Sequence, residues 1–274
     1  MIGQAKRLYE LNILQSEKIK SGFSCPVIVF TSGKGGTGKT FVTANYSFLL
    51  AKNKKVLVVD FDQNFANLHI LLNVTPKKNI YHFFNDSAGP EELIFEYNAN
   101  LHFIFGESGK LDYPEFNETM VYKLISELSS LSAKYDAIIF DTSSGAKKET
   151  VKLLNFANII YLVSSSLPTA VMDGYVILKL LKFYKNRSVV KVIMNKSDKA
   201  KGDEAFKNLS SAAMHFLSLN IHYAGNIELN KSVILSIEEQ KLLAEYNPTN
   251  EVTFQIEQIV NDFANNKHVV NNSQ

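Results

Sequence analysis

The chain is poor in cysteine: Cys25 is the only one among its 274 residues. One cysteine excludes an intrachain disulfide framework, and it excludes iron–sulfur or metal sites built on cysteine pairs of a single chain. We therefore expect a reducing, cytoplasmic setting. Because Cys25 stands beside a short apolar run, we expect it to be a small buried hydrophobic residue.

An excess of charge of either sign is also missing. Lysine and arginine number 29, aspartate and glutamate 27, and the formal net charge is +2. This balance excludes a strongly basic nucleic-acid-binding protein and an acidic tail protein. Apolar residues make up 46% of the chain, which is enough for a sizeable buried core.

Long apolar runs are absent as well. The longest, such as Ile159–Val163, have the length of a strand and fall far short of the roughly 20 residues that span a bilayer. Residues 1–20 scatter their apolar side chains among charged ones, which is not typical of a signal peptide. The sequence predicts a cytoplasmic protein whose contact with the inner face of the cell membrane is at most peripheral.

Short apolar runs alternate with longer helical patterns along the chain. We predict strands at Val27–Thr31, Val56–Asp60, Leu101–Phe105, Ala137–Asp141, Ile159–Val163, Val189–Met194 and Ile221–Ala224. We predict helices near Lys39–Lys52, Met120–Ala133, Lys147–Phe156, Ala170–Tyr184, Asp203–Leu217, Ser232–Leu243 and Asn250–Ala264. Strands that are apolar throughout are typical of burial on both faces. The alternation indicates an α/β fold, a doubly wound and mostly parallel sheet of about seven or eight strands with helices on both faces.

No linker rich in proline, glycine or serine divides the chain, and no internal repeat is visible. We therefore predict a single α/β domain over residues 25–265. An N-terminal arm, residues 1–24, precedes it. A polar tail, residues 266–274, follows it.

The strongest motif lies between the first predicted strand and the first predicted helix, where residues 31–40 read T-S-G-K-G-G-T-G-K-T. It matches the G-x-x-x-x-G-K-[ST] pattern of a phosphate-binding loop in the required strand–helix context. Glycines let the backbone wrap phosphates closely, and successive N–H groups with the helix N-terminus attract anionic oxygens. Lys39 is expected to reach the β- and γ-phosphates and the Thr40 hydroxyl to bind Mg²⁺. The expected nucleotide-binding residues of this segment are Gly33, Lys34, Gly35, Gly36, Thr37, Gly38, Lys39, Thr40 and, through its backbone N–H, Phe41.

A second lysine, Lys34, stands near the start of this loop, and K-G-G-T-G-K-T resembles the deviant P-loop of the MinD/ParA family of ATPases. The resemblance implies a homodimer that forms around ATP and Mg²⁺. It also implies that Lys34 crosses the dimer interface to contact the nucleotide of the partner. There it would offset charge on the transferred phosphoryl group, as an arginine finger does.

Two carboxylates follow the second predicted strand, in the run V-V-D-F-D-Q-N-F-A-N-L at residues 58–68. This run resembles the family pattern D-x-D-x-G-x-A-N-L. The resemblance implies that Asp62 orients and activates the attacking water, that Asp60 supports the Mg²⁺ shell, and that Asn67 belongs to a switch segment. Asn64 replaces the glycine of the pattern. A helix N-cap is the alternative role for Asp62.

The fourth predicted strand ends in aspartate, in the run F-D-T-S-S-G at residues 140–145. Apolar residues ending in aspartate beside the phosphate-loop strand are typical of a Walker B element, so Asp141 is expected to hold Mg²⁺. The D-T-x-x-G form resembles the family, and Gly145 is expected to let a switch loop sense the γ-phosphate. Capping of the next helix is the alternative role for Asp141.

Asn195 ends the sixth predicted strand in V-I-M-N-K, which resembles the family segment V-x-N-[RK] that recognises the base. Its amide offers one donor and one acceptor, which match an adenine edge. A simple turn residue is the alternative. The proline that flanks the base in relatives is missing near residues 225–228.

Residues 3–8, G-Q-A-K-R-L, resemble the D-Q-A-x-x-L-R activator helix of flagellar-number regulators, the FlhG/FleN branch of the family. That resemblance implies a spatial or numerical switch for flagellar number or placement, with an FlhF-like GTPase or another cargo or regulator as protein partner. Gly3 and Tyr9 depart from the pattern, and an amphipathic arm packing on its own domain remains an alternative.

Two other functions stay open at this stage. A ParA-like ATPase that partitions DNA or cargo is one, although the charge balance argues against nonspecific DNA as a partner. A nucleotide-responsive scaffold with little hydrolysis is the other.

The last predicted helix carries an apolar stripe made of Val252, Ile256, Ile259, Val260 and Phe263. Basic residues are sparse beside it, whereas a membrane-surface helix has lysine or arginine flanking its apolar face. We expect this stripe to pack in the core.

Overall fold

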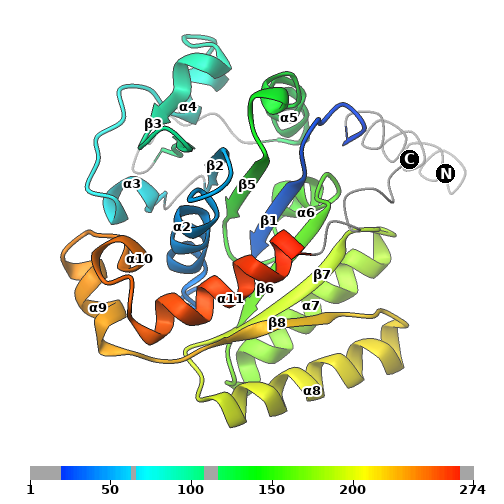
Figure 1. Ribbon diagram of the computed structural model, residues 1–274. Helices are drawn as coiled ribbons and strands as arrows, with labels where there is room; N and C mark the ends of the chain where they lie inside the picture. The colour runs from blue at the N-terminus through cyan, green and yellow to red at the C-terminus, as the bar shows by residue number, and fades with distance from the viewer. Residues whose placement is uncertain (1–19, 63–65, 108–116, 266–274) are drawn as a thin grey trace, which may run out of the picture.

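The computed structural model describes residues 20–62, 66–107 and 117–265. Its centre is an eight-stranded sheet of order β3-β4-β2-β5-β1-β6-β7-β8 (Figure 1). The strands are β1 (Val27–Thr31), β2 (Val56–Phe61), β3 (Ile94–Glu96), β4 (Leu101–Ile104), β5 (Ala137–Thr142), β6 (Ile159–Ser164), β7 (Val189–Asn195) and β8 (His222–Ile227). All neighbours pair in parallel except β3, which runs antiparallel to β4 at one edge.

Helices cover both faces of this sheet. They are α2 (Lys39–Leu50), α3 (Leu68–Leu71), α4 (Ile80–Phe84), α5 (Glu118–Leu131), α6 (Lys148–Leu154), α7 (Pro168–Phe183), α8 (Lys199–Leu217), α9 (Lys231–Glu238), α10 (Leu243–Tyr246) and α11 (Glu251–Asn265). One core cluster lies under α5, α6, α7 and α8, and the other lies under α2, α10 and α11. Strand β1 serves both: Val27 and Val29 point into the first cluster, Ile28 and Phe30 into the second. Its side chains are therefore apolar without alternation, as burial on two faces requires.

The predicted doubly wound α/β fold is confirmed, with a strand at each of the seven predicted places. The eighth strand, β3, was missed because it is three residues long and only half buried, so it carries no continuous apolar run. The helix predicted over Ser232–Leu243 is wrong in its length. It ends at Glu238, and Gln240 takes a left-handed backbone (φ 54°) before α10 begins.

The C-terminal helix α11 packs in the core, as its stripe predicts. Val252, Ile256, Ile259 and Val260 are buried in the cluster under α2, and α11 contacts both α2 and β8. An ion pair of the buried Lys191 with Asp262 also ties α11 to β7. Across the parts of the chain that the structure describes, no helix has the length and apolar character needed to cross a membrane.

The parallel order has one consequence for function. Because β1, β2, β5 and β7 are parallel, their carboxyl ends lie on the same side of the sheet. This is the side on which open α/β sheets bind their ligands. In the β2–β5 register Asp60 stands directly beside Asp141, and in the β1–β5 register Phe30 stands beside Asp141. The predicted phosphate loop and both predicted metal-binding carboxylates thus meet at the same place.

Candidate functional site

The phosphate loop, residues 33–40, runs from the end of β1 into the start of α2. Gly38 forms the N-cap of α2 with a left-handed backbone (φ 83°), a conformation that costs other residues free energy. Gly33 is needed for a different reason, because a Cβ there would lie 2.2 Å from the backbone carbonyl of Asp173 in α7. The loop is therefore held between α2 and the first turns of α7.

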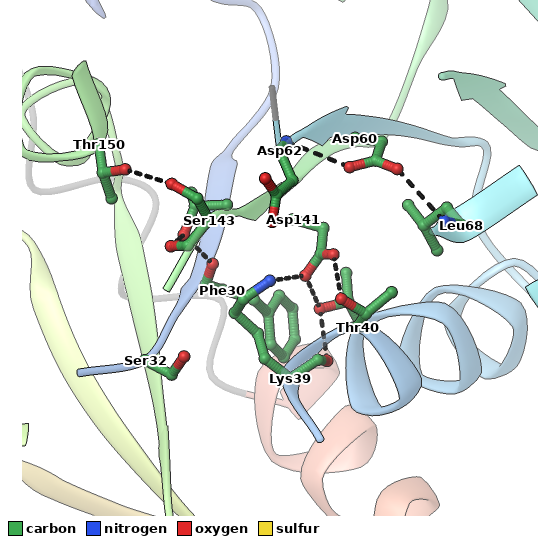
Figure 2. A network of polar contacts seen from close by, with 12 residues as sticks. Phe30, Ser32, Lys39, Thr40, Asp60, Asp62, Leu68, Asp141, Ser143 and Thr150 are labelled. Atoms are coloured by element: carbon green, nitrogen blue, oxygen red, sulfur yellow. Dashed lines mark hydrogen bonds and ion pairs between the residues drawn. The ribbon is translucent and has the colours of Figure 1, made fainter. Parts of the chain in front are cut away.

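Asp141 is the centre of a buried network at the end of β5 (Figure 2). The Lys39 ammonium lies 2.7 Å from its Oδ1, and the Thr40 hydroxyl donates to its Oδ2 over 2.7 Å. The Thr43 hydroxyl lies 2.9 Å from Asp141 Oδ1 and 3.0 Å from the Lys39 carbonyl, two acceptors for its one proton. Lys39 is 7% exposed and Asp141 1%, so water screens this pair little. Sequence reasoning missed Thr43, although its position four residues after Lys39 places both on one face of α2.

Asp60 is buried beside this network, 1% exposed, at the end of β2. Its carboxylate accepts the backbone N–H groups of Asp62 and Leu68 over 3.2 and 3.3 Å. Burial, and then the negative charge of Asp141, raise the pKa of Asp60 to about 8. Two neighbouring carboxylates with this mutual repulsion form a place where a divalent cation is favoured.

Stability is expected to depend on the charge of Asp60. Its folded pKa of about 8 lies above an unfolded value of about 4. The folded state therefore keeps a proton that the unfolded state loses, and this contribution to the free energy of unfolding falls as the pH rises through that window. We expect Asp60→Asn to stabilise the metal-free protein relative to wild type, with a gain that grows from about pH 4 to about pH 8. Urea unfolding across pH measures it, with the exposed Asp86→Asn as control, and a gain that does not change with pH would contradict the burial of this charge.

The residues present fit a Mg²⁺–nucleotide ligand. The Thr40 hydroxyl and the Asp141 carboxylate, with Asp60 behind them, are oxygen donors of the kind that Mg²⁺ prefers. In the described part of the chain no group of three or more His, Cys, Asp or Glu could hold a metal. The buried Thr37 hydroxyl of the phosphate loop has no hydrogen-bond partner among the described residues, so a polar ligand would satisfy it.

The two segments that the sequence predicts to act as switches follow β2 and β5. Asp62 is half-buried just after β2, and Figure 2 shows it beside Asp141 and Asp60. Asn67, exposed, is the N-cap residue of α3, so Asp62 does not cap that helix. Gly145 takes a left-handed backbone (φ 85°), and its N–H donates to the Ser32 carbonyl over 2.8 Å. The loop after β5, a predicted switch, is thus hydrogen-bonded to the residue that precedes the phosphate loop. Asn64 lies outside the described residues.

Asp141 does not cap the helix after it either, because Lys147 is the N-cap residue of α6. The exposed Lys34 side chain extends from the phosphate loop to α7. Its ammonium lies 3.3 Å from the hydroxyl of Thr169 in the first turn of that helix. The Phe41 side chain is buried in the core under α2, which leaves only its backbone for a ligand.

Asn195 lies against the phosphate loop. Its side-chain amide donates to the Thr37 carbonyl over 2.7 Å, and the residue is 4% exposed. The neighbouring Lys196 donates to the Gly36 carbonyl over 2.9 Å. Sequence reasoning named Asn195 for the base only, and a role for it in adenine recognition stays a prediction.

The fold and the loop define a P-loop nucleotide-binding protein. A family model described as an AAA domain matches residues 25–195. The flagellum site-determining protein YlxH of Helicobacter pylori is 32% identical over 268 residues, which cover 94% of this chain and 89% of that protein. The antiactivator FleN of Pseudomonas aeruginosa is 27% identical over 224 residues, covering 81% of this chain and 80% of FleN.

The chain belongs to the MinD/ParA family of P-loop ATPases, as its loop predicts. Among solved structures, the septum site-determining protein MinD of Pyrococcus horikoshii OT3, complexed with Mg-ADP, has a TM-score of 0.76 at 21% identity, covering 91% of this chain and 99% of that chain. The MinC:MinD complex of Aquifex aeolicus has a TM-score of 0.72 at 22% identity and covers 88% of this chain and 96% of that chain. These likenesses confirm the MinD-like fold.

Proposed function

We propose that this protein is a Mg²⁺-dependent ATPase that dimerises around ATP and acts as a spatial or numerical switch, of the kind that regulates flagellar number or placement. One observation supports the ATPase activity. Lys39 and Thr40, at the end of the phosphate loop, are both hydrogen-bonded to Asp141. The relative YlxH, a flagellum site-determining protein, supports the flagellar role.

Each residue has a chemical task in this proposal. Lys39 leaves Asp141 for the β- and γ-phosphates, since both offer negative charge to the same ammonium. Mg²⁺, when bound at Thr40 and Asp141, neutralises charge on the phosphate oxygens. Asp62 orients the attacking water, and Lys34 exchanges the Thr169 hydroxyl for the nucleotide of the partner copy.

The test is to measure ATP turnover and molar mass of the full chain with Mg-ATP. We expect wild type to turn over repeatedly and to become dimeric. We expect Lys34→Ala to bind ATP but to lose at least about 10³-fold in turnover, the magnitude typical of a charge-stabilising finger. Lys199→Ala, another exposed lysine, is the matched control. A wild type that binds ATP without turnover would indicate a scaffold, and a Lys34→Ala variant with normal turnover would contradict action across the interface.

The remaining proposals concern organisation and partners. We assign residues 25–265 to the ATPase domain, residues 1–24 to an arm and residues 266–274 to a tail, in a cytoplasmic protein. The arm is proposed to engage an FlhF-like GTPase or another regulator, and residues 1–19 lie outside the described residues. The net charge of +2 disfavours nonspecific DNA, and a gel shift at low salt tests this.

A further inference from the structure

The turn that joins β7 to α8, residues 195–198, lies against the phosphate loop. Asn195 donates to the Thr37 carbonyl over 2.7 Å, and Lys196 donates to the Gly36 carbonyl over 2.9 Å. At the start of the loop the Ser32 hydroxyl donates to the Lys34 carbonyl over 3.1 Å. Three carbonyl groups of one short loop are therefore held by side chains.

These contacts also set the direction of the N–H groups in the loop. In a planar trans peptide the C=O and N–H groups point in opposite directions. Holding the Gly36 carbonyl therefore directs the Thr37 N–H the other way, and holding the Thr37 carbonyl does the same for the Gly38 N–H. A phosphate requires N–H groups that point inward and carbonyls that point outward. The two side chains of the turn thus oppose a peptide flip that would aim an oxygen at the anion.

The turn itself is firmly built. Lys196 has a left-handed backbone (φ 57°), which is unfavourable for lysine and persists only where the surroundings impose it. Ser197 fixes the turn from two sides: its hydroxyl accepts the Ser166 N–H over 2.9 Å, and its carbonyl accepts the Asn226 amide over 2.8 Å. The turn is therefore fixed by the segment after β6 and by β8, and can in turn fix the phosphate loop.

The fit between turn and loop is also close. A Cβ on Gly38 would lie 2.4 Å from the Asn195 amide nitrogen. The glycine is therefore required by the turn as well as by its own backbone angle. Asn195 is buried, so its hydrogen bond to the loop competes little with water.

We propose that Asn195 and Lys196 are positioning residues of the phosphate loop, which hold its N–H groups ready for a polyphosphate whether or not a base is attached. The inference rests on the proposed nucleotide-binding function and deepens it. It differs from base reading in one measurable way. Substituting a residue that recognises the base lowers the affinity only for ligands that carry a base. Substituting a residue that positions the loop lowers the affinity for inorganic tripolyphosphate as well.

The experiment is calorimetric titration of the full chain with inorganic tripolyphosphate and with ATP. Lys196→Met removes the ammonium from an exposed side chain, Lys196→Arg keeps a donor, and Asn195→Leu removes the buried amide at nearly constant size. Lys199→Met, an exposed lysine paired with Asp203, is the control. We expect Lys196→Met and Asn195→Leu to weaken both ligands by about 5-fold, the effect of one hydrogen bond, with Lys196→Arg close to wild type.

Thermal unfolding without ligand separates this role from general destabilisation. Lys196→Met is expected to have the same unfolding temperature as wild type and yet to bind tripolyphosphate more weakly. This variant keeps the test valid even if Asn195→Leu fails to fold. Unchanged tripolyphosphate affinity in Lys196→Met, or loss of ATP affinity alone, would overturn the inference. A wild type that binds neither ligand would instead contradict the proposed function from which the inference starts.

Discussion

Replacing Lys39 with methionine is expected to abolish ATP binding and to destabilise the nucleotide-free protein at the same time. The binding loss follows from removing the cation that we propose to contact the phosphates, and we expect it to exceed about 100-fold. The stability loss follows from the structure. The Lys39 ammonium lies 2.7 Å from Asp141, and both are buried. Removing one partner of a buried pair leaves an uncompensated charge and costs about 3–5 kcal/mol.

A second substitution distinguishes the two effects. Asp141→Asn in the Lys39→Met background removes the orphaned charge, so the double variant is expected to recover part of the stability while binding stays lost. Urea unfolding and fluorescent-nucleotide titration measure the two quantities. Lys52→Met, a half-exposed lysine of the segment after α2, is the control. A Lys39→Met variant as stable as wild type would show that the Thr40 and Thr43 hydroxyls satisfy Asp141 without the ammonium.

Replacing Asp62 with alanine is expected to leave ATP binding and dimerisation intact while turnover falls by about 10²–10⁴-fold, the range of general acid–base catalysis. Asp62 lies half-buried beside Asp60 and Asp141, outside the phosphate loop. Its backbone N–H, which donates to Asp60, is kept by alanine. Asp60 therefore keeps this hydrogen bond, and only the side chain that we propose to orient water is lost.

Light scattering with Mg-ATP and phosphate release measure the two consequences. The expected result is a dimer that persists for as long as ATP remains. Asp86→Ala removes an aspartate that is 80% exposed and paired with Lys123, and it should behave as wild type. An Asp62→Ala variant that stays monomeric with ATP yet hydrolyses normally would contradict the role assigned to Asp62.

Much of the fold was predictable because its signals are local. The run V-I-V-F-T of β1 is buried at every residue, and such a run has to lie inside a sheet covered on both faces. The phosphate loop is local too, since consecutive residues share covalent geometry and the glycines stand where the backbone turns. The short antiparallel β3 was not predictable, because three partly exposed residues are too few to show an alternation of apolar and polar side chains.

The site divides in the same way. Neighbouring residues were enough to predict the phosphate loop, Lys34 within it and the carboxylates at the ends of β2 and β5, because each motif follows directly on its strand in the chain. Three contacts could be seen only in the folded chain: Asp60 stands beside Asp141, Thr43 hydrogen-bonds to Asp141, and Asn195 donates to the Thr37 carbonyl. These contacts join residues far apart in sequence. They depend on strand order and register, which the core imposes and which no local pattern encodes.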